Sequence, residues 1–583
     1  AALGQAHVGP HPSVHDTVAG IVDRFRKTIP QKELLAMAAA KAKSLLTEKE
    51  LNTLATEHVT FRVNIPVKVI IIRDAAMGDK PFWLKDRGFA PMGFKITIQD
   101  TETDFWMKDF EAGRIGLGVN SLTGGDAHYI VALMPLTKET KLEVTELYPG
   151  QLRVGALKDG LQPFVDRPEA MPELPVLPGI LSGLTVIRTQ YESRDDAKLI
   201  NLYQSTKHPA QAKPDQVMLT WSGDPQTTQT IQWRTGPTVN KGQVQWVKKS
   251  AYNRFQPAQP KRANATTFKM ENANLLNDPV IHRHTATLTG LDPDTTYLYS
   301  VGDGSDDGWS EMSDFTTAPG RTEPFSFVYM GDAQNGLERW GSLVHRAFRQ
   351  RPDAAFYIMA GDLVDRGDWD SLFHNARGIY DRRPVVPAIG NHENQGGHPG
   401  MYLQMFDLPK NGPEKVEPER AYTYKYSNAE FFVLDSNLTP KSQSAWLENV
   451  LKNSKATWKF AVYHHPAYSS SPDRDNPSIR DHWTPLFDKY HLDMALQGHD
   501  HAYLRTYPMK DQKKVETTAE GTVYIVSVSG TKFYEQDPRE YIEFGMTNVS
   551  TFQVLDIQIS GNRLVYRSYD GDGKLRDNLI IEK

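Results

Sequence analysis

From Phe325 onward, short apolar runs alternate with longer segments that mix apolar and polar residues. The apolar runs are rich in β-branched and aromatic residues, which predicts strands. These predicted strands are Ser326–Met330, Phe356–Ala360, Val385–Ile389, Phe431–Asp435, Lys459–Tyr463 and Met494–Gln497. The first three lie about thirty residues apart, the length of a strand–helix–strand unit. Segments between them, such as Leu337–Arg349 and Ser442–Ser454, have the length of helices, so the pattern predicts an α/β domain.

Upstream, between residues 205 and 318, short β-type runs alternate with turn residues. The clearest runs are Val217–Trp221, Thr230–Trp233, Thr285–Leu288 and Tyr297–Val301. Their spacing predicts a β-sandwich of about a hundred residues. The stretch Leu288–Tyr297 resembles the corner between strands E and F of fibronectin type III domains, which implies a structural role for its tyrosine.

The first part of the chain has a different pattern. Apolar residues recur at helical spacing through Phe25, and helix is also predicted over Lys32–Ala55, beyond a break at Pro30. Strand-like runs follow at Val59–Val63, Val67–Ile72 and Tyr129–Leu133. We therefore expect an N-terminal α+β domain over residues 1–190, whose role is unknown because it carries no catalytic motif. Closely spaced prolines over Pro163–Pro178 disfavour helix and central strand, which places a domain boundary near them.

Composition narrows the class of protein. The composition, 39% hydrophobic and 23% charged residues, is ordinary for a globular protein. A chain of 583 residues is too long for a single hydrophobic core, so several domains are expected. The net charge of -5 provides no basic field for nucleic acid. The sequence has no apolar run of about 18 residues that could span a bilayer. The absence of cysteine excludes disulfides, thiolate ligands and cysteine nucleophiles.

Five motifs with metal-binding side chains each follow a predicted strand of the α/β region. They are Gly331–Gln334, Gly361–Gly367, Gly390–Glu393, His464–Pro466 and Gly498–His501. Ligands of such sheets lie beyond the carboxyl ends of the strands, where all five motifs fall. Carboxylate, amide and imidazole groups suit hard or borderline divalent metals. The ordered series therefore predicts a two-metal site; the alternative is a set of loop residues that cap helices.

The spacing within the motifs indicates how two metals would be shared. The candidate ligands are Asp332, Gln334, Asp362, Asn391, His464, His499 and His501. Asp362 is the candidate for the central carboxylate that bridges both metals. Asp332 and Gln334 lie two residues apart and can face the first metal. His499 and His501 have the same spacing and can be divided between the two metals. Asn391 and His464 then complete the ligands of the second metal.

The motif series resembles that of the calcineurin-like metallophosphoesterase superfamily over about Phe325–Lys583. Together with the preceding sandwich it resembles the purple acid phosphatases. The resemblance extends through Gly498–Arg505 and into Tyr569–Lys574. It implies a metallophosphoesterase αββα sandwich over residues 323–583, preceded by an all-β fibronectin type III-like sandwich over residues 200–320. It leaves the first 200 residues unexplained.

Two positions depart from the purple acid phosphatases. That family has a tyrosinate three residues after the bridging aspartate, where this chain has Asp365, so an Fe(III)-tyrosinate is not expected. Gln334 stands where the family usually has glycine and most other superfamily members have histidine. Its amide oxygen can take the place of that histidine. An uncharged oxygen favours two divalent ions, and ligand type does not choose among Mn, Fe and Zn.

The segment Asp365-Arg366-Gly367 resembles the protein Ser/Thr phosphatases of the same superfamily. By that resemblance, Asp365 forms a hydrogen bond with the catalytic His392, and Arg366 holds a phosphate oxygen. An aspartate that orients a histidine favours the imidazolium that a general acid needs. The alternatives are a turn residue at Asp365 and a surface ion pair at Arg366.

These features indicate a binuclear-metal-dependent hydrolase of phosphate monoesters, in which metal-bound hydroxide attacks phosphorus in line. The expected partner is a small-molecule phosphate ester and not a nucleic acid, and the oligomeric state stays open. The pair Asp332 and Gln334 leaves a phosphodiesterase or nucleotide pyrophosphatase as an alternative. A non-catalytic, metal-stabilised binding protein is the alternative of another class. Because the chain begins with Ala1, we expect a processed protein that is secreted or periplasmic, with a cytoplasmic protein as the alternative.

Overall fold

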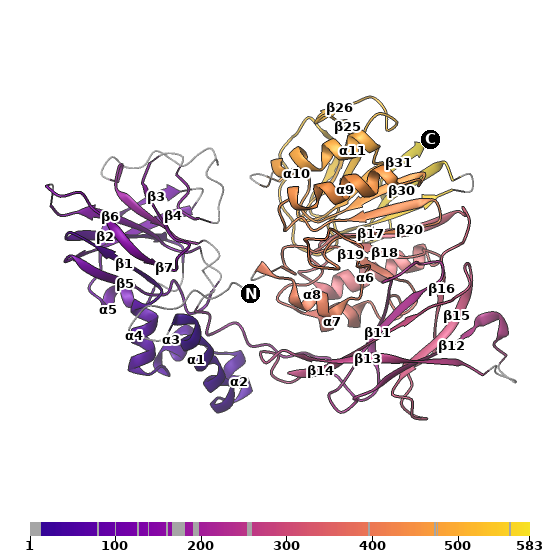
Figure 1. Cartoon of the computed structure of the whole chain (residues 1–583), viewed down its shortest axis with the longest axis horizontal. Helices are drawn as coiled ribbons and strands as arrows, with labels where there is room; N and C mark the ends of the chain where they lie inside the picture. Colours follow the sequence, from indigo (N-terminus) through magenta and orange to yellow (C-terminus); the bar gives the residue numbers. More distant parts are fainter. Residues whose placement is uncertain are drawn as a thin grey trace. The chain divides into compact units, whose positions relative to one another are not determined.

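The chain forms two compact units, residues 1–205 with 274–276 and residues 206–273 with 277–583 (Figure 1). Within the part of the chain that the structure describes, no helix is long and apolar enough to cross a membrane. In this computed structural model the described residues are 13–77, 81–98, 101–124, 127–137, 139–158, 161–165, 181–190, 197–253, 259–394, 397–471, 474, 476–558 and 561–583. Most of the predicted boundary segment Pro163–Pro178 lies outside them.

The first unit begins with short helices. They are α1 (Val14–Thr28), α2 (Gln31–Leu35), α3 (Ala39–Ser44) and α4 (Glu48–Thr56). The helix predicted over Lys32–Ala55 is thus interrupted twice. Thr47 begins α4 with a capping box, in which its hydroxyl accepts the Glu50 N–H at 3.2 Å and the Glu50 carboxylate accepts the Thr47 N–H at 2.7 Å. Helices this short depend on packing, here around the buried Ile21 and Phe25 of α1.

Two sheets follow, with strand orders β5-β1-β7 and β3-β4-β2-β6-β9-β8. The elements are β1 (Val59–Val63), β2 (Val67–Asp74), α5 (Trp83–Asp86), β3 (Ala90–Ile98), β4 (Thr101–Phe110), β5 (Gly113–Leu117), β6 (Ile130–Pro135), β7 (Val144–Tyr148), β8 (Arg153–Ala156) and β9 (Thr185–Arg188). Strand β2 is buried on both faces, because Val69 and Ile71 pack in one core and Ile70 and Ile72 in another. Strands β1, β2 and β6 lie where strands were predicted, which confirms the α+β class of this unit.

A buried histidine pair in the first unit predicts a loss of stability in acid. Nε2 of His58 lies 2.8 Å from Nε2 of His128, whose Nδ1 donates to the carbonyl oxygen of Tyr129 at 2.7 Å. Burial lowers the pKa of His128 from 6.5 to about 4, so the folded state stays neutral where the unfolded chain takes up a proton. Its contribution to stability is complete above pH 6.5 and is lost as the pH falls toward 4, by about 3 kcal/mol.

Hydrogen exchange followed by mass spectrometry can read this loss in peptides from β2 and β6. We expect protection, corrected for intrinsic exchange rates, to fall through that pH window. His128→Gln removes one of the two buried imidazoles whose pKa burial lowers, and should reduce the pH dependence. His15→Gln, at an exposed position of α1, should leave it unchanged. The same pH dependence in the His128 variant and the wild type would contradict the prediction.

The second unit opens with a β-sandwich whose strands follow the order β10-β11-β14-β13-β12-β15-β16. The elements are β10 (Asp215–Thr220), β11 (Gln229–Thr235), β12 (Gly242–Lys248), the 3₁₀ helix η2 (Lys249–Ala251), β13 (Lys261–Glu271), β14 (Val280–Leu288), β15 (Thr296–Gly302) and β16 (Ser313–Thr316). Trp233, Val301 and Phe315 lie in its core. The hydroxyl of Tyr297 accepts the backbone N–H of Asp292 at 2.9 Å, which confirms the predicted tyrosine corner.

A buried arginine joins this sandwich to the α/β domain of the same unit. The guanidinium of Arg234, whose side chain is 1% exposed, lies 2.7 Å from Asp215 of the sandwich and 2.7 Å from Asp370 of the α/β domain. A buried charge needs such partners, and Asp278 adds a third carboxylate at 3.4 Å. The backbone N–H of Leu219 also donates to the carbonyl oxygen of Tyr380 at 2.8 Å. These contacts hold the two domains together.

The α/β domain consists of two sheets between two layers of helices (Figure 1). One sheet contains β17 (Phe325–Met330), β18 (Tyr357–Met359), β19 (Val385–Pro387), β29 (Thr551–Ile557), β30 (Arg563–Asp570) and β31 (Leu575–Glu582). The other contains β20 (Tyr422–Tyr426), β21 (Ala429–Val433), β22 (Trp458–Val462), β23 (Met494–Gln497), β24 (Tyr503–Thr506), β27 (Val523–Val526) and β28 (Ile542–Met546). A small ribbon is formed by β25 (Met509–Lys510) and β26 (Lys513–Lys514). The helices are α6 (Leu337–Gln350), α7 (Trp369–Asn375) and α8 (Gly400–Met405) on one side, and α9 (Lys441–Asn453), α10 (Pro477–His482) and α11 (Thr484–Tyr490) on the other.

Aromatic rings fill the space between these two sheets. Phe327 of β17 packs edge-on against Phe431 and Phe460 of the other sheet, with ring centroids 5.3 and 5.4 Å apart. Strands β17, β18 and β19 run parallel, as do β21, β22, β23 and β27. The predicted strands from residue 326 to 497 coincide with these elements, so the αββα fold class is confirmed. All five motifs follow the carboxyl ends of parallel strands.

Candidate metal centre

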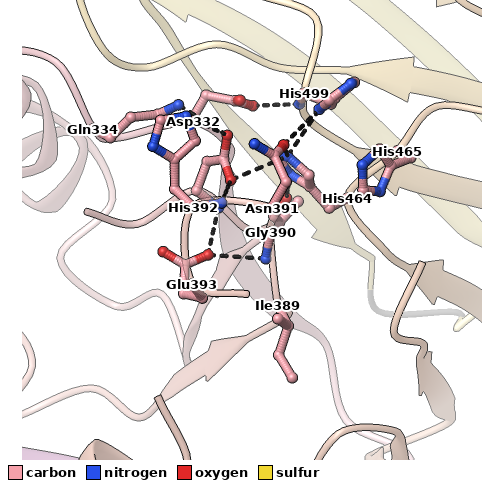
Figure 2. A network of polar contacts seen from close by, with 12 residues as sticks. Asp332, Gln334, Ile389, Gly390, Asn391, His392, Glu393, His464, His465 and His499 are labelled. Atoms are coloured by element: carbon pink, nitrogen blue, oxygen red, sulfur yellow. Dashed lines mark hydrogen bonds and ion pairs between the residues drawn. The ribbon is translucent and has the colours of Figure 1, made fainter. Parts of the chain in front are cut away.

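The motif residues converge beyond β17, β18, β19, β22 and β23 (Figure 2). Three of the candidate ligands adopt left-handed backbone conformations, with φ of 50° at Asp332, 50° at Asp362 and 73° at His499. Such conformations cost about 1–3 kcal/mol in residues other than glycine and persist where surrounding contacts enforce them. Backbone strain of this kind often accompanies functional sites, and here it coincides with the motifs.

Four of the candidate ligands follow a glycine, which allows the loops to approach closely. A Cβ atom on Gly390 would lie 2.2 Å from Oδ1 of Asp362, and one on Gly498 would lie 2.3 Å from Oδ2 of Asp332. The Cβ on Gly390 would also lie 2.2 Å from the backbone nitrogen of Asp362, so the facing loop itself would have to move. The pairs Gly-Asn and Gly-His in the motifs therefore reflect packing of one loop on the next as well as the chemistry of the ligands.

One group of ligand atoms comes from Asp362, His464 and His499, and all three atoms lie within 4.8 Å of one another. Nε2 of His464 is 3.2 Å from Oδ1 of Asp362 and 3.2 Å from Nδ1 of His499. Oδ1 of Asn391 lies 2.9 Å from the same His499 nitrogen and 3.1 Å from Nε2 of His464 (Figure 2). The structure thus brings together one carboxylate, one amide and two imidazoles.

A second group of ligand atoms comes from Asp332, Asp362 and His501, again within 4.8 Å. Gln334 joins it, because its Nε2 lies 2.9 Å from Oδ2 of Asp362 and 3.5 Å from Nε2 of His501. Asp362 is common to both groups. The distribution of His499 and His501 between the two groups is the one that their spacing predicted.

Backbone carbonyls orient two of the imidazoles. Nδ1 of His464 lies 2.9 Å from the carbonyl oxygen of Ala360, and Nδ1 of His501 lies 3.1 Å from that of Lys532. A carbonyl oxygen can only accept, so in each ring Nδ1 carries the proton. In the neutral ring the lone pair of Nε2 then faces the carboxylates, as a metal ligand requires.

The orphaned polar atoms at the centre fit a pair of cations. Asp332 and Gln334 are both fully buried, and Oδ1 of Asp332 and Oε1 of Gln334 have no hydrogen-bond partner among the described residues. Unpaired buried oxygens of this kind are costly. Burial raises the pKa of Asp332 well above its ordinary value, and a bound cation would reverse that shift. The donor set, oxygen with imidazole nitrogen, suits Mn²⁺, Fe²⁺ or Zn²⁺.

His392 lies beside this centre and contacts Asp365. Its Nδ1 is 2.9 Å from Oδ1 of Asp365, and its Nε2 is 3.8 Å from Oδ2 of Asp362. Burial opposes the charged imidazole, but the hydrogen bond with Asp365 and the nearby Asp362 outweigh it and raise the pKa of His392. Arg366 lies at the rim, where its side chain is 67% exposed and its Nε is 3.7 Å from Asp365.

Glu393 supports the central loop, a role that the sequence analysis did not assign. Its carboxylate accepts the backbone N–H groups of Asp362 and Leu363, each at 2.9 Å, and that of Gly390 at 2.8 Å (Figure 2). It therefore ties the loop after β18 to the loop after β19. The motif Gly390–Glu393 included this residue, but only the approach of the two loops shows what it does.

A second support comes from the loop after β21. The side-chain amide of Asn437 donates to the carbonyl oxygens of Ile389 at 3.2 Å and Gly390 at 3.3 Å, next to Asn391. In the same loop, Ser436 Oγ lies 2.8 Å from Nδ1 of His465. The ring centroid of His465 lies 4.3 Å from that of His499, so this loop supports the backbone beside Asn391 and, through His465, the ring of His499.

Family comparisons agree with this geometry. Residues 325–503 match the family model for calcineurin-like phosphoesterases, and residues 214–317 match that for the purple acid phosphatase N-terminal domain. The fold and the site define residues 325–503 as a calcineurin-like phosphoesterase domain. With the sandwich before it, the chain carries the domain pair of the purple acid phosphatases.

The proteins that are similar to this chain in sequence or in fold carry different names. An uncharacterized protein of Mycobacterium tuberculosis is 27% identical over 286 residues, 41% of this chain and 53% of that protein, so the chain spans about half the length of that relative. An Arabidopsis thaliana protein named "Probable inactive purple acid phosphatase 1" is 24% identical over 424 residues, 61% of this chain and 67% of that protein. The structure of a purple acid phosphatase from yellow lupin (Lupinus luteus) seeds has a TM-score of 0.56 and 16% identity over 91% of both chains. This last likeness concerns the fold.

Proposed function

We propose that the chain hydrolyses phosphate monoesters with two divalent metal ions bound at this site. The observation that carries the proposal is the pair of ligand groups that share Asp362. Two ions held by these two sets of side chains would supply the Lewis acidity that an in-line displacement at phosphorus needs. The pairing of the sandwich with the phosphoesterase domain, as in the purple acid phosphatases, favours a monoester as substrate.

Each ion would be held by residues from several loops. One set is Asp332, Gln334, Asp362 and His501, and the other is Asp362, Asn391, His464 and His499. When bound, the two ions supply Lewis acidity toward the phosphoryl oxygens and lower the pKa of the attacking water. The protein contributes a rigid frame, because the Nδ1 contacts of His464 and His501 keep their Nε2 atoms directed inward.

His392 is proposed to donate the proton that the leaving oxygen takes up. Asp365 holds its Nδ1, which leaves Nε2 on the side of the metal centre, 3.8 Å from Asp362. The raised pKa of His392 keeps the imidazolium available at higher pH than for a free histidine. Arg366 is proposed to add positive charge at the rim, against the phosphoryl oxygens.

The identity of the ions follows in part from Asp365. It stands where the purple acid phosphatases have a tyrosinate, and it contacts His392 at 2.9 Å. The proposed ligand sets contain no phenolate. We therefore propose two divalent ions without the absorption band of an Fe(III)-tyrosinate.

The test is a side-by-side assay of the Mn²⁺- or Zn²⁺-loaded protein on p-nitrophenyl phosphate and bis(p-nitrophenyl) phosphate. We expect a preference for the monoester of at least about a hundredfold in kcat/KM. A preference for the diester would overturn the monoester proposal in favour of a phosphodiesterase, for which Gln334 is then the first residue to examine. Full metal occupancy without hydrolysis of either ester would place the chain with its inactive relatives as a binding protein.

A further inference from the structure

A tyrosine flanked by two cations borders the candidate metal centre. Cζ of Arg474 lies 5.0 Å from the ring centroid of Tyr534, and Nζ of Lys532 lies 5.1 Å from the same centroid. The ring of Tyr534 in turn packs edge-on against the ring of His501, with centroids 4.8 Å apart. We call Arg474, Lys532 and Tyr534 the cationic rim.

The cationic rim is tied directly to the ligand loops. The backbone N–H of Tyr534 donates to the carbonyl oxygen of His501 at 2.9 Å, and the carbonyl oxygen of Lys532 accepts Nδ1–H of His501 at 3.1 Å. On the other side, Nη2 of Arg474 donates to the carbonyl oxygen of His499 at 2.9 Å and its Nε to Asp500 at 3.0 Å. The rim therefore keeps a defined position relative to both histidine ligands.

Several hydrogen-bond donors of the cationic rim have no partner among the described residues. Lys532 is exposed, and its Nζ, 5.1 Å from the ring centroid of Tyr534, forms no ion pair with any carboxylate of the described residues. Within the same described part of the chain, Nη1 of Arg474 and the hydroxyl of Tyr534 have no hydrogen-bond acceptor. Asp500 balances the charge of Arg474, and among the described residues no carboxylate pairs with the ammonium of Lys532.

A cation over an aromatic ring is a common contact, and at exposed sites its interaction free energy is about 0.5–1 kcal/mol. One such contact would need no explanation beyond packing. Two cations on one ring, with free donors and next to a histidine ligand, match a dianionic group instead. The phosphoryl group that reacts would lie against the metal ions, so the rim would receive a different group of the substrate.

We propose that the cationic rim binds a second phosphate group of the substrate, so that the preferred esters carry two phosphates. This inference rests on the proposed phosphoesterase function. Charge-assisted hydrogen bonds from an ammonium, a guanidinium and a phenol to phosphate are strong and directional. They would raise affinity for a bisphosphate or diphosphate without changing the reaction at the metal centre.

Kinetics on matched pairs of substrates test the proposal. The pairs are fructose 1,6-bisphosphate with fructose 6-phosphate, and ADP with AMP, with p-nitrophenyl phosphate as a substrate that lacks a second phosphate. In the metal-loaded wild type we expect one or both doubly phosphorylated substrates to have a KM at least about tenfold lower than their partners. Lys532→Ala should raise that KM about tenfold and leave kcat and the kinetics on p-nitrophenyl phosphate within about twofold.

Two further variants sharpen the comparison. Lys532→Arg retains the charge and should restore most of the preference, which a purely structural role of the lysine would not explain. Lys452→Ala removes an exposed lysine in the last turn of α9 and should have no effect. Isothermal titration of fructose 1,6-bisphosphate and ADP into the metal-loaded proteins gives the same comparison without turnover.

The outcomes separate the two proposals. If p-nitrophenyl phosphate is hydrolysed but neither doubly phosphorylated substrate is preferred, or if Lys532→Ala keeps the preference, the cationic rim is structural and the proposed function stands. If no ester is hydrolysed, the proposed function fails. In that case, titration that shows equal binding to wild type and Lys532→Ala would overturn the rim as well.

Discussion

An Asp362→Asn variant is expected to lose tight binding of both metal ions and at least about a thousandfold of its kcat/KM on p-nitrophenyl phosphate. Asp362 is 1% exposed, and its carboxylate belongs to both groups of ligand atoms. An amide offers one neutral oxygen in place of two that share a negative charge, so it binds a pair of cations much more weakly. Lewis-acid stabilisation of several kcal/mol corresponds to a factor of this size. Plasma mass spectrometry of the dialysed protein gives the metal content, and initial rates give the activity.

Asp353→Asn is the matched control for this prediction. Asp353 lies in the turn before β18, is exposed, and contacts Arg351 at 3.5 Å. The control should keep two ions per chain and the activity of the wild type. The shared role of Asp362 would be refuted by a folded Asp362→Asn protein that still binds two ions or keeps more than about a tenth of the activity.

The position of the candidate site was predictable because its residues follow the carboxyl ends of parallel strands, which lie at one edge of the sheets. Asp332, Asp362 and Asn391 each follow an apolar run, and parallel strands deliver their carboxyl ends to one region. The strands themselves were predictable because they are buried on both faces and so form continuous apolar runs. The local sequence therefore contains the candidate ligands, and the direction of the strands before them predicts that they lie close together.

The supports of the site were not predictable in this way. Asn437 reaches Gly390 from a loop that carries no recognisable motif. Lys532 and Tyr534 contact His501 from the segment after β27, which the sequence analysis passed over. Such contacts depend on where a loop lies in space, and the residues of the loop alone do not determine that.

The first unit shows the same limit for secondary structure. Its strands follow from alternation and β-branched residues, as in Val67–Ile72. The breaks within Lys32–Ala55 were missed because that segment is rich in good helix formers throughout. One local signal was available, since Thr47 and Glu50 have the spacing of a capping box and mark the start of α4.

A His392→Asn variant is expected to separate substrates by their leaving groups. A general acid matters most where the departing oxygen is strongly basic, so hydrolysis of glycerol 2-phosphate should fall by about a hundredfold or more in kcat. p-Nitrophenolate leaves without much help from a proton, so kcat on p-nitrophenyl phosphate should fall less than about tenfold. Because Asp365 orients the ring at 2.9 Å, Asp365→Asn should show the same direction of change with smaller factors.

The comparison of the two substrates decides what His392 does. An equal loss on both esters would assign the residue to stabilising charge on the phosphoryl group and remove it from the role of proton donor. His482→Asn, at a half-buried position of α10 outside the metal centre, is the control and should change neither rate. Metal content must stay at the wild-type level in every variant, because Asn391 is adjacent and a lost ion would lower both rates together. A leaving-group effect at full metal content would then belong to the imidazole itself.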